Sequence, residues 1–157
     1  MNLSKYLMPN RLRILGVIFF TIGVILLILK YKFNYKPEFL NLKVFAIYSF
    51  YIEAKTFEMI THQMIADIAG IFLLTGLFIL SFTKEKNESE AIDSLRLKAF
   101  ILAAYVNLIY LLSSILFFFG FGFVGAITLY SIIWIAVYFL IFRFLLIKKN
   151  RAGFIRE

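Results

Sequence analysis

Four long apolar runs divide this chain, and they constrain its fold more than any other feature. The runs are Ile14–Leu29, Ile65–Phe82, Ala99–Phe119 and Phe123–Ile147. A helix needs roughly 20 mostly apolar residues to cross a bilayer, and it satisfies its own backbone hydrogen bonds there. We therefore predict an all-α membrane protein, a bundle of four transmembrane helices. The predicted spans cover residues 14–30, 65–82, 99–119 and 123–147.

Composition agrees with this class, because 62% of the 157 residues are hydrophobic and only 17% are charged. Soluble domains are typically about 45–50% apolar and about 25% charged. No linker rich in Pro, Gly or Ser divides the chain, so we predict a single polytopic domain over residues 1–157. No small-residue cleavage site follows the first run, which predicts an uncleaved span. Gly120, Gly122 and Gly125 predict a tight turn between the last two spans.

The net charge and the lack of cysteine exclude several kinds of site. The net charge is +8, but the basic residues flank apolar runs and do not alternate with aromatic residues. We therefore expect no direct contact with nucleic acid. The chain contains no cysteine, which rules out disulfides, thiolate metal sites and cysteine nucleophiles.

The distribution of Lys and Arg predicts the orientation of the spans. If both termini are cytoplasmic, twelve of the 17 Lys and Arg residues lie on the cytoplasmic side and five lie outside. Basic residues are in excess in the cytoplasmic segments of membrane proteins. We therefore expect residues 31–64 to form an extracytoplasmic loop and residues 84–98 to form a cytoplasmic link.

The outer loop holds an apolar stretch, residues 39–50, that is too short and too polar for a fifth span. Its alternating apolar positions are Leu40, Leu42, Val44, Ala46 and Tyr48. This alternation has the period of a β-strand, and residues 55–60 would supply a partner strand. A small β-hairpin is one interpretation of the loop, and an amphipathic helix at the membrane surface is the other.

The link between the second and third spans carries eight charges in fifteen residues, from Lys84 to Lys98. Asn87 is followed three residues later by Glu90, which is the pattern of a helix N-cap. We therefore expect the third helix to begin near Glu88, outside the bilayer, and to continue into it as one rod.

An apolar stripe runs along this charged helix through Ile92 and Leu95, and Asp93 has the spacing to pair with Arg96. One interpretation is a solvated extension of the third span. The other is a docking surface formed by these four residues for a cytoplasmic partner, because exposed apolar patches often mark interaction sites. The chain's own tail, residues 148–157, is an alternative cover for the stripe.

Few groups in this sequence could perform catalysis. His62 is the only histidine, and it lies five residues before Asp67, an acid within the second run. The two form a candidate site at the outer mouth, and the alternative is a hydrated carboxylate bonded to the loop. No second histidine, carboxylate pair or phosphate-binding loop accompanies them, so we predict no enzyme, no metal site and no cofactor. Arg143, near the end of the fourth run, is expected to reach lipid headgroups.

Four polar side chains are expected at a similar depth in the four spans. They are Thr21, Thr75, Asn107 and Tyr138. Polar groups at one level commonly form hydrogen bonds between helices, each contributing about 0.6–2 kcal/mol. The two interpretations of this candidate layer are hydrogen bonding between helices and a solute site. Gly16 and Gly23 share one helix face and would allow a second helix to approach closely.

Three stretches of the chain carry a resemblance to a known family. They are "MPNRLRILGVIFF", "FLNLKVFAIYSF" and "ADIAGIFLLTGLFILSFTKEKNESEAIDSLRLKAFILAAYVNLIYLL". From Met8 to about Leu146 the chain resembles a family of small, uncharacterised four-span bacterial membrane proteins, most distinctively over residues 81–107. Their genes often lie beside a gene for a small helix-turn-helix regulator. The resemblance implies a multi-pass protein of the bacterial inner membrane, with that regulator as a candidate partner.

Three function classes follow from these observations. The first is a non-enzymatic membrane regulator or sensor that acts through a small cytoplasmic partner. The second is a small-solute permease or a permease subunit, which would need a continuous polar path through the bilayer. The third is an accessory or assembly protein of the envelope. The bilayer itself is a partner in every case, and a homo-oligomer is compatible with all three.

Overall fold

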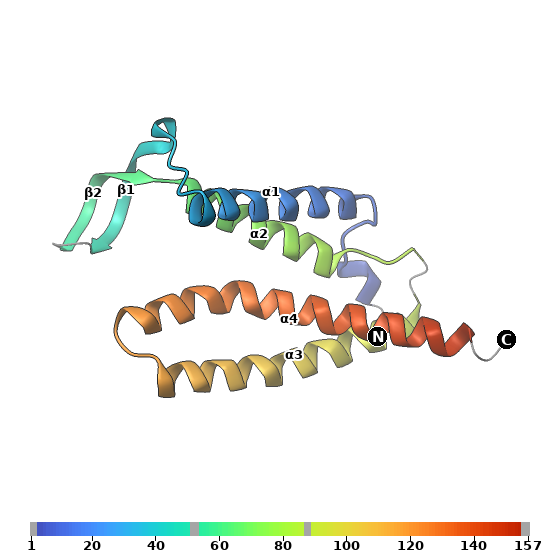
Figure 1. Cartoon of the computed structure of the whole chain (residues 1–157). Helices are drawn as coiled ribbons and strands as arrows, with labels where there is room; N and C mark the ends of the chain where they lie inside the picture. The colour runs from blue at the N-terminus through green and yellow to red at the C-terminus, as the bar shows by residue number, and fades with distance from the viewer. Residues whose placement is uncertain (1–2, 51–53, 87–88, 155–157) are drawn as a thin grey trace. The chain divides into compact units, whose positions relative to one another are not determined.

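The computed structural model describes residues 3–50, 54–86 and 89–154 (Figure 1). Two compact units make up the chain, residues 1–18 with 74–157 and residues 19–73, and each is described by itself. Helices α1 and α2 each contribute one part to the first unit and the other part to the second.

Helices dominate the described residues. They are α1 (Leu12–Lys32), α2 (Ile65–Phe82), α3 (Glu90–Phe117) and α4 (Phe121–Phe154). All four are long and apolar enough to cross a membrane, which confirms the four predicted helical runs and indicates a multi-pass membrane protein. Helix α1 has 21 residues and is therefore about 31 Å long, although its apolar run alone is short for a bilayer.

Helix α3 begins two residues later than expected. Helix α3 begins at Glu90, with Ser89 at the N-cap, and not near Glu88. Ser89 accepts the first bonds through its backbone carbonyl, from the N–H groups of Ile92 at 2.8 Å and Asp93 at 3.1 Å. Asn87, the expected cap, lies outside the described residues. Glu90 and Asp93 in the first turn favour the positive end of the helix dipole.

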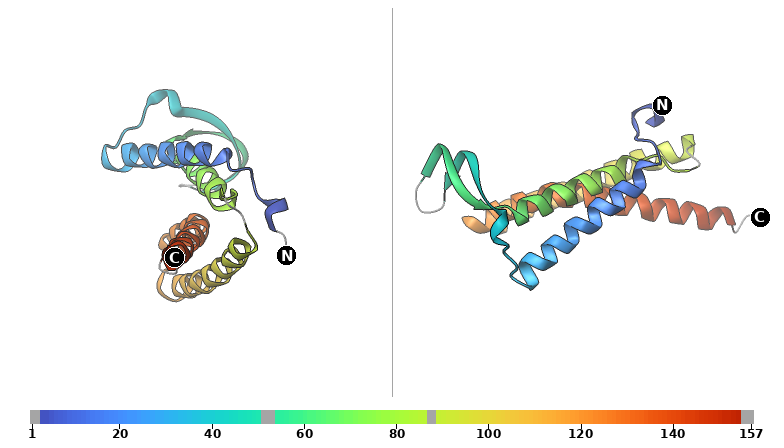
Figure 2. Two further views of the ribbon diagram at one scale, coloured as in Figure 1. Left: turned by 90° about the vertical axis from the view of Figure 1, so that its right-hand side faces the viewer. Right: turned by 90° about the horizontal axis from the view of Figure 1, so that it is seen from above.

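Helices α3 and α4 form an antiparallel pair and run side by side in Figure 1 and in the left view of Figure 2. Gly120 has a φ of 59°, a left-handed conformation that costs glycine little, and α4 starts at the next residue. Gly122 and Gly125 lie inside α4, so the turn is shorter than the three glycines predicted. The hydroxyl of Tyr110 donates a hydrogen bond to the carbonyl of Ala126 at 3.0 Å and joins the two helices.

The buried core of the first unit lies between α3 and α4. It consists of Ile92, Ala99, Ala103, Tyr138 and Phe142. The alanines are fully buried and small, so the two helices can approach closely while the rings of α4 fill the space beside them.

The N-terminal segment is held by backbone hydrogen bonds that the sequence pattern did not predict. The N–H of Met8 donates to the carbonyl of Phe82 at 2.9 Å, and the N–H of Lys84 donates to the carbonyl of Met8 at 2.9 Å. These bonds join residues that are far apart in the sequence to the end of α2, and they satisfy polar groups that the end of a helix leaves open.

The second unit contains the predicted β-hairpin. Strand β1 (Asn41–Phe50) pairs antiparallel with β2 (Ala54–Gln63), and Figure 2 shows the hairpin leading into the start of α2. Leu42 lies opposite His62 and Val44 lies opposite Ile60. The expected strand period is confirmed, and the interfacial helix is not the structure of this loop.

Glycines allow α1 and α2 to approach closely within each unit. In the second unit, a Cβ added at Gly23 would lie 2.8 Å from Leu73 Cγ and 2.8 Å from the Leu73 backbone nitrogen. In the first unit, a Cβ added at Gly16 would lie 2.9 Å from Ile79 Cγ2. A methyl group does not fit at these distances, so the small-residue face predicted from the sequence is a packing face.

Candidate functional site

Glu85 joins two arginines at one end of the first unit. Its Oε2 lies 2.8 Å from Arg13 Nη1, and its Oε1 lies 3.1 Å from Arg143 Nη1. The Glu85 side chain is 12% exposed, so these bonds form largely away from water. Charge-assisted hydrogen bonds of this kind contribute about 1.5–3 kcal/mol. One carboxylate therefore links the start of α1 to the far part of α4.

Arg143, which was expected to reach lipid headgroups, has partners within the protein. It contacts Glu85, and its guanidinium carbon lies 5.2 Å from the centre of the Phe139 ring. The sequence contained a signal for this contact, because a charge inside an apolar run usually has a partner. It contained no signal that Glu85 is that partner.

Arg96 caps the end of α2. Its Nη1 donates to the carbonyl of Ser81 at 3.1 Å, and its Nη2 donates to the carbonyl of Thr83 at 2.9 Å. The guanidinium also lies over the Phe142 ring, 4.4 Å from its centre, and the residue is 3% exposed. The last carbonyls of a helix lack partners within it and carry partial negative charge, which explains a buried cation at this position.

The predicted docking stripe is covered by the chain itself. Ile92 is 6% exposed and belongs to the core beside Phe142, and Leu95 packs against the same core. Asp93 and Arg96 are also buried. The expectation of an open surface at these four residues is therefore corrected, because Phe142 of α4 packs in the core with Ile92 and Arg96 bonds the end of α2.

Aromatic rings surround a cavity of about 410 Å³ in the first unit. It lies among Phe78, Phe82, Phe100, Trp134 and Tyr138, from α2, α3 and α4. A second cavity of about 230 Å³ shares three of these rings, Phe82, Phe100 and Tyr138, and extends to Tyr6 and Arg96. The Phe82 and Tyr138 rings stack at 5.5 Å. Lining of this kind suits an apolar ligand better than a polar one.

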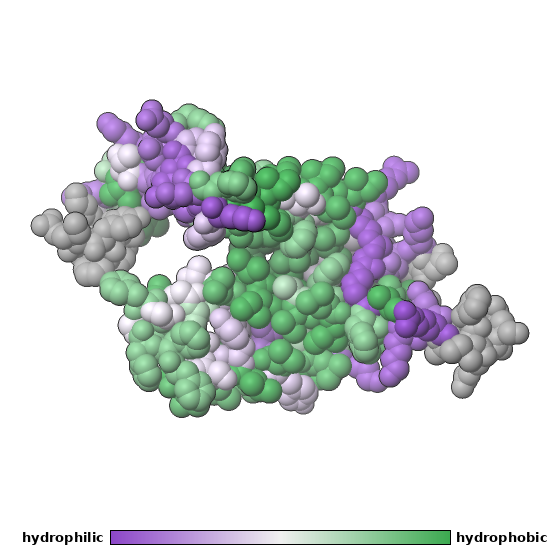
Figure 3. Space-filling view, viewed as in Figure 1, coloured by the Kyte–Doolittle hydropathy of each residue, from purple (hydrophilic) through white to green (hydrophobic). Residues whose placement is uncertain are grey.

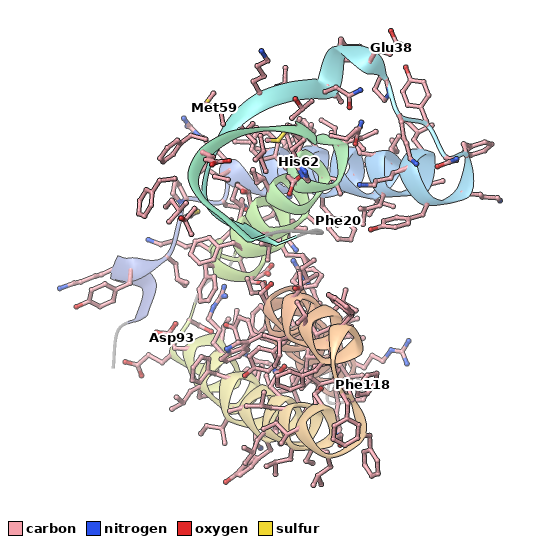
Figure 4. The ribbon with its side chains drawn as sticks, turned by 90° about the vertical axis from the view of Figure 1, so that its left-hand side faces the viewer. Phe20, Glu38, Met59, His62, Asp93 and Phe118 are labelled. Carbon is pink, nitrogen blue, oxygen red and sulfur yellow. The ribbon has the colours of Figure 1, made fainter. Side chains whose placement is uncertain are left out.

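His62 and Asp67 come together in the second unit, as the outer-mouth hypothesis requires. His62 Nε2 lies 2.8 Å from Asp67 Oδ2, which links the end of β2 to the first turn of α2 (Figure 4). Their side chains are 31% and 47% exposed, so the bond is weak. Among the described residues, no group of three His, Cys, Asp or Glu side chains could hold a metal ion.

The four residues of the predicted polar layer occupy different surroundings. Asn107 is 2% exposed, and its amide donates to the carbonyl of Ala103 on the same helix at 2.7 Å. Tyr138 is buried among rings, and Thr75 is half-buried. Thr21 is exposed and belongs to the second unit, so a common layer stays a prediction.

Comparisons of this chain with family models, curated proteins and solved structures found no match. The candidate site therefore consists of what the geometry itself brings together. It is the ionic cluster of Arg13, Glu85 and Arg143, with the capping Arg96 and the aromatic cavities beside it.

Proposed function

We propose that this chain is a non-enzymatic membrane regulator or sensor that acts through a small cytoplasmic partner. In this proposal it lies in a bacterial inner membrane with both termini in the cytoplasm. The family resemblance supports a helix-turn-helix regulator as that partner. The excess of basic residues at the chain ends and in the charged link supports the orientation.

The observation that carries the proposal is the length and charge of α4. Its 34 residues make it about 51 Å long, while the hydrocarbon core of a bilayer is about 30 Å thick. The last turns hold Lys148, Lys149 and Arg151, all exposed. A helix that leaves the membrane with an uncovered basic end suits an acidic surface on a partner protein.

The ionic cluster supports a role in passing on a signal. Glu85 connects the α4 extension, through Arg143, to the start of α1 through Arg13. A change at either helix would therefore alter the surroundings of a single, nearly buried carboxylate. Energetic coupling between two helices requires an element that can adopt two conformations, and we propose the Glu85 side chain, which both arginines share, as that element.

Charge reversal tests this function. The variant K148E/K149E should release the cytoplasmic partner from the tagged, detergent-solubilised protein, measured by quantitative mass spectrometry against the parent chain. The matched control is K36E/K43E, which reverses two exposed lysines in the loop and at the hairpin. Where a helix-turn-helix gene adjoins this one, its product is measured first. Equal retention by both variants would contradict the proposal.

A further inference from the structure

Ring side chains from three helices gather around one space in the first unit. Phe78 and Phe82 come from α2, Phe100 comes from α3, and Trp134 and Tyr138 come from α4. The cavity of about 410 Å³ is large enough for a small ligand. Its other lining includes Ser131, the smallest side chain around it.

The second cavity adjoins the first and has a charged residue in its lining. It shares Phe82, Phe100 and Tyr138 with the first and adds Arg96 and Tyr6. Arg96 donates to the carbonyl of Thr83, which lies two residues before Glu85 of the ionic cluster. The face in Figure 3 shows hydrophilic residues gathered at the ends and hydrophobic residues along the helices. The two cavities together therefore have a polar end and an apolar end, as an amphiphile has.

The charged residues in and beside the two linings indicate the charge of the headgroup that would bind there. Among the described residues, neither lining contains an acidic residue, and the smaller one contains Arg96, whose guanidinium bonds the carbonyls of Ser81 and Thr83. The neighbours of the lining in sequence include Lys5, next to Tyr6, and Lys98, two residues after Arg96, and both lysines are exposed. Asp93, one turn before Arg96, is the nearest acid along α3. The excess of cations favours a negative headgroup.

We infer that these cavities bind one anionic lipid of the surrounding bilayer. An acyl chain lies in the larger cavity against Trp134, and the headgroup lies at the Arg96 end. A chain with 62% hydrophobic residues and four helices able to cross a membrane meets lipid on every helix, so this ligand is always at hand. The inference stands independently of the proposed cytoplasmic partner.

The chain carries its own reporter, because Trp134 is its only tryptophan and it lines the cavity. The full-length protein is placed in nanodiscs of phosphatidylcholine with a rising fraction of phosphatidylglycerol whose acyl chains are brominated. Bromine quenches tryptophan fluorescence at short range. We expect quenching to saturate at a low fraction of the brominated anionic lipid. Brominated phosphatidylcholine should require at least a fivefold higher fraction.

Two variants and one control test the site. S131F places a ring in the larger cavity, so the saturable quenching should disappear. L140F adds the same ring at a residue of α4 that is 63% exposed and outside both linings, so it should quench as the parent does. K5Q/K98Q removes two exposed cations and should raise the half-saturating fraction about fivefold for each lysine.

Three results would overturn the inference. The first is equal quenching by the two brominated lipids in the parent chain. The second is saturable quenching that survives in S131F. The third concerns oligomeric state, measured by the mass of the nanodisc complex. In this result the parent chain is a dimer, S131F is a monomer, and quenching is lost together with the dimer. That result would identify a second copy of the chain, and not a lipid, as the occupant.

Discussion

Glu85 has two arginine partners, and its side chain is only 12% exposed, so its charge is largely shielded from water. It lies 2.8 Å from Arg13 and 3.1 Å from Arg143, and both contacts are between atoms far apart in sequence. Removing one partner of a nearly buried ion pair leaves the other charge desolvated, which is costly. The stability of the first unit should therefore depend on this side chain.

The substitution E85Q should lower the thermal unfolding temperature of the detergent-solubilised protein. The amide keeps the shape but removes the negative charge that both guanidinium groups share, and we expect a loss of about 1–3 kcal/mol. The control is E38Q, because Glu38 is exposed in the loop before β1. If E85Q and E38Q melt alike, the cluster does not stabilise the fold.

Two glycines of the second unit should respond differently to one added methyl group. At Gly23 a Cβ would meet Leu73 at 2.8 Å, whereas at Gly70 nothing lies within 4 Å. G23A should therefore destabilise the protein by about 1–3 kcal/mol. G70A should be neutral or stabilising by up to about 1 kcal/mol, since alanine favours a helix. Thermal melts of the two variants measure the difference, and a reversed order would show that α1 and α2 do not pack through Gly23.

Among the elements that the structure describes, several polar contacts join the end of one element to another. Arg96 of α3 donates to the carbonyl of Ser81 near the end of α2. The backbone N–H of Met8, in the N-terminal segment, donates to the carbonyl of Phe82 at the same helix end. In the second unit, His62 at the end of β2 meets Asp67 in the first turn of α2. Within α3, by contrast, Asn107 and Ser114 each donate to a carbonyl of their own helix, so the bonds that join different elements use groups that a helix end leaves unpaired.

The register of the hairpin can be tested because the chain has no cysteine of its own. Val44 lies opposite Ile60, so V44C/I60C should form a disulfide under mild oxidation. V44C/T61C is the matched control, since neighbouring residues of a strand point to opposite faces and Thr61 lies opposite Lys43. A mobility shift on gels without reductant reports the bond. Equal cross-linking of both pairs would contradict the register.

At the scale of the whole molecule, an even number of spans places both termini on one side of the membrane. The segments at that side are the start of α1 with Arg13, the link with Glu85, the start of α3 with Arg96 and the last part of α4 with Arg143. Basic residues are retained in the cytoplasm when a membrane protein inserts, so this charged end is the one we expect there. The hairpin, which precedes α2, would then lie outside.

Reporter fusions test this orientation directly. Fusions after Lys86 and at the C-terminus should be active only with a cytoplasmic reporter, and a fusion at Lys36 only with an extracytoplasmic one. Because the loop is itself basic, with Lys30, Lys32, Lys36, Lys43 and Lys55, the charge bias is incomplete. A cytoplasmic signal at Lys36 would reverse the proposed arrangement.

The four helices could be predicted from the apolar runs, because a bilayer acts on each segment locally. The period of Leu42 and Val44 indicated a hairpin but left an interfacial helix open, and the pairing of β1 with β2 resolved that choice. Element boundaries were less certain, as the start of α3 at Glu90 shows.

The packing of distant segments fixed which side chains meet. Ile92 and Arg96 belonged to the predicted docking surface, yet Ile92 packs in the core with Phe142 of α4, and Arg96 donates to the carbonyl of Ser81 at the end of α2. Arg13 and Glu85 are separated by 72 positions, and no local pattern pairs them. Such contacts depend on how distant helices pack, and periodicity within one segment carries no information about the partner that covers it.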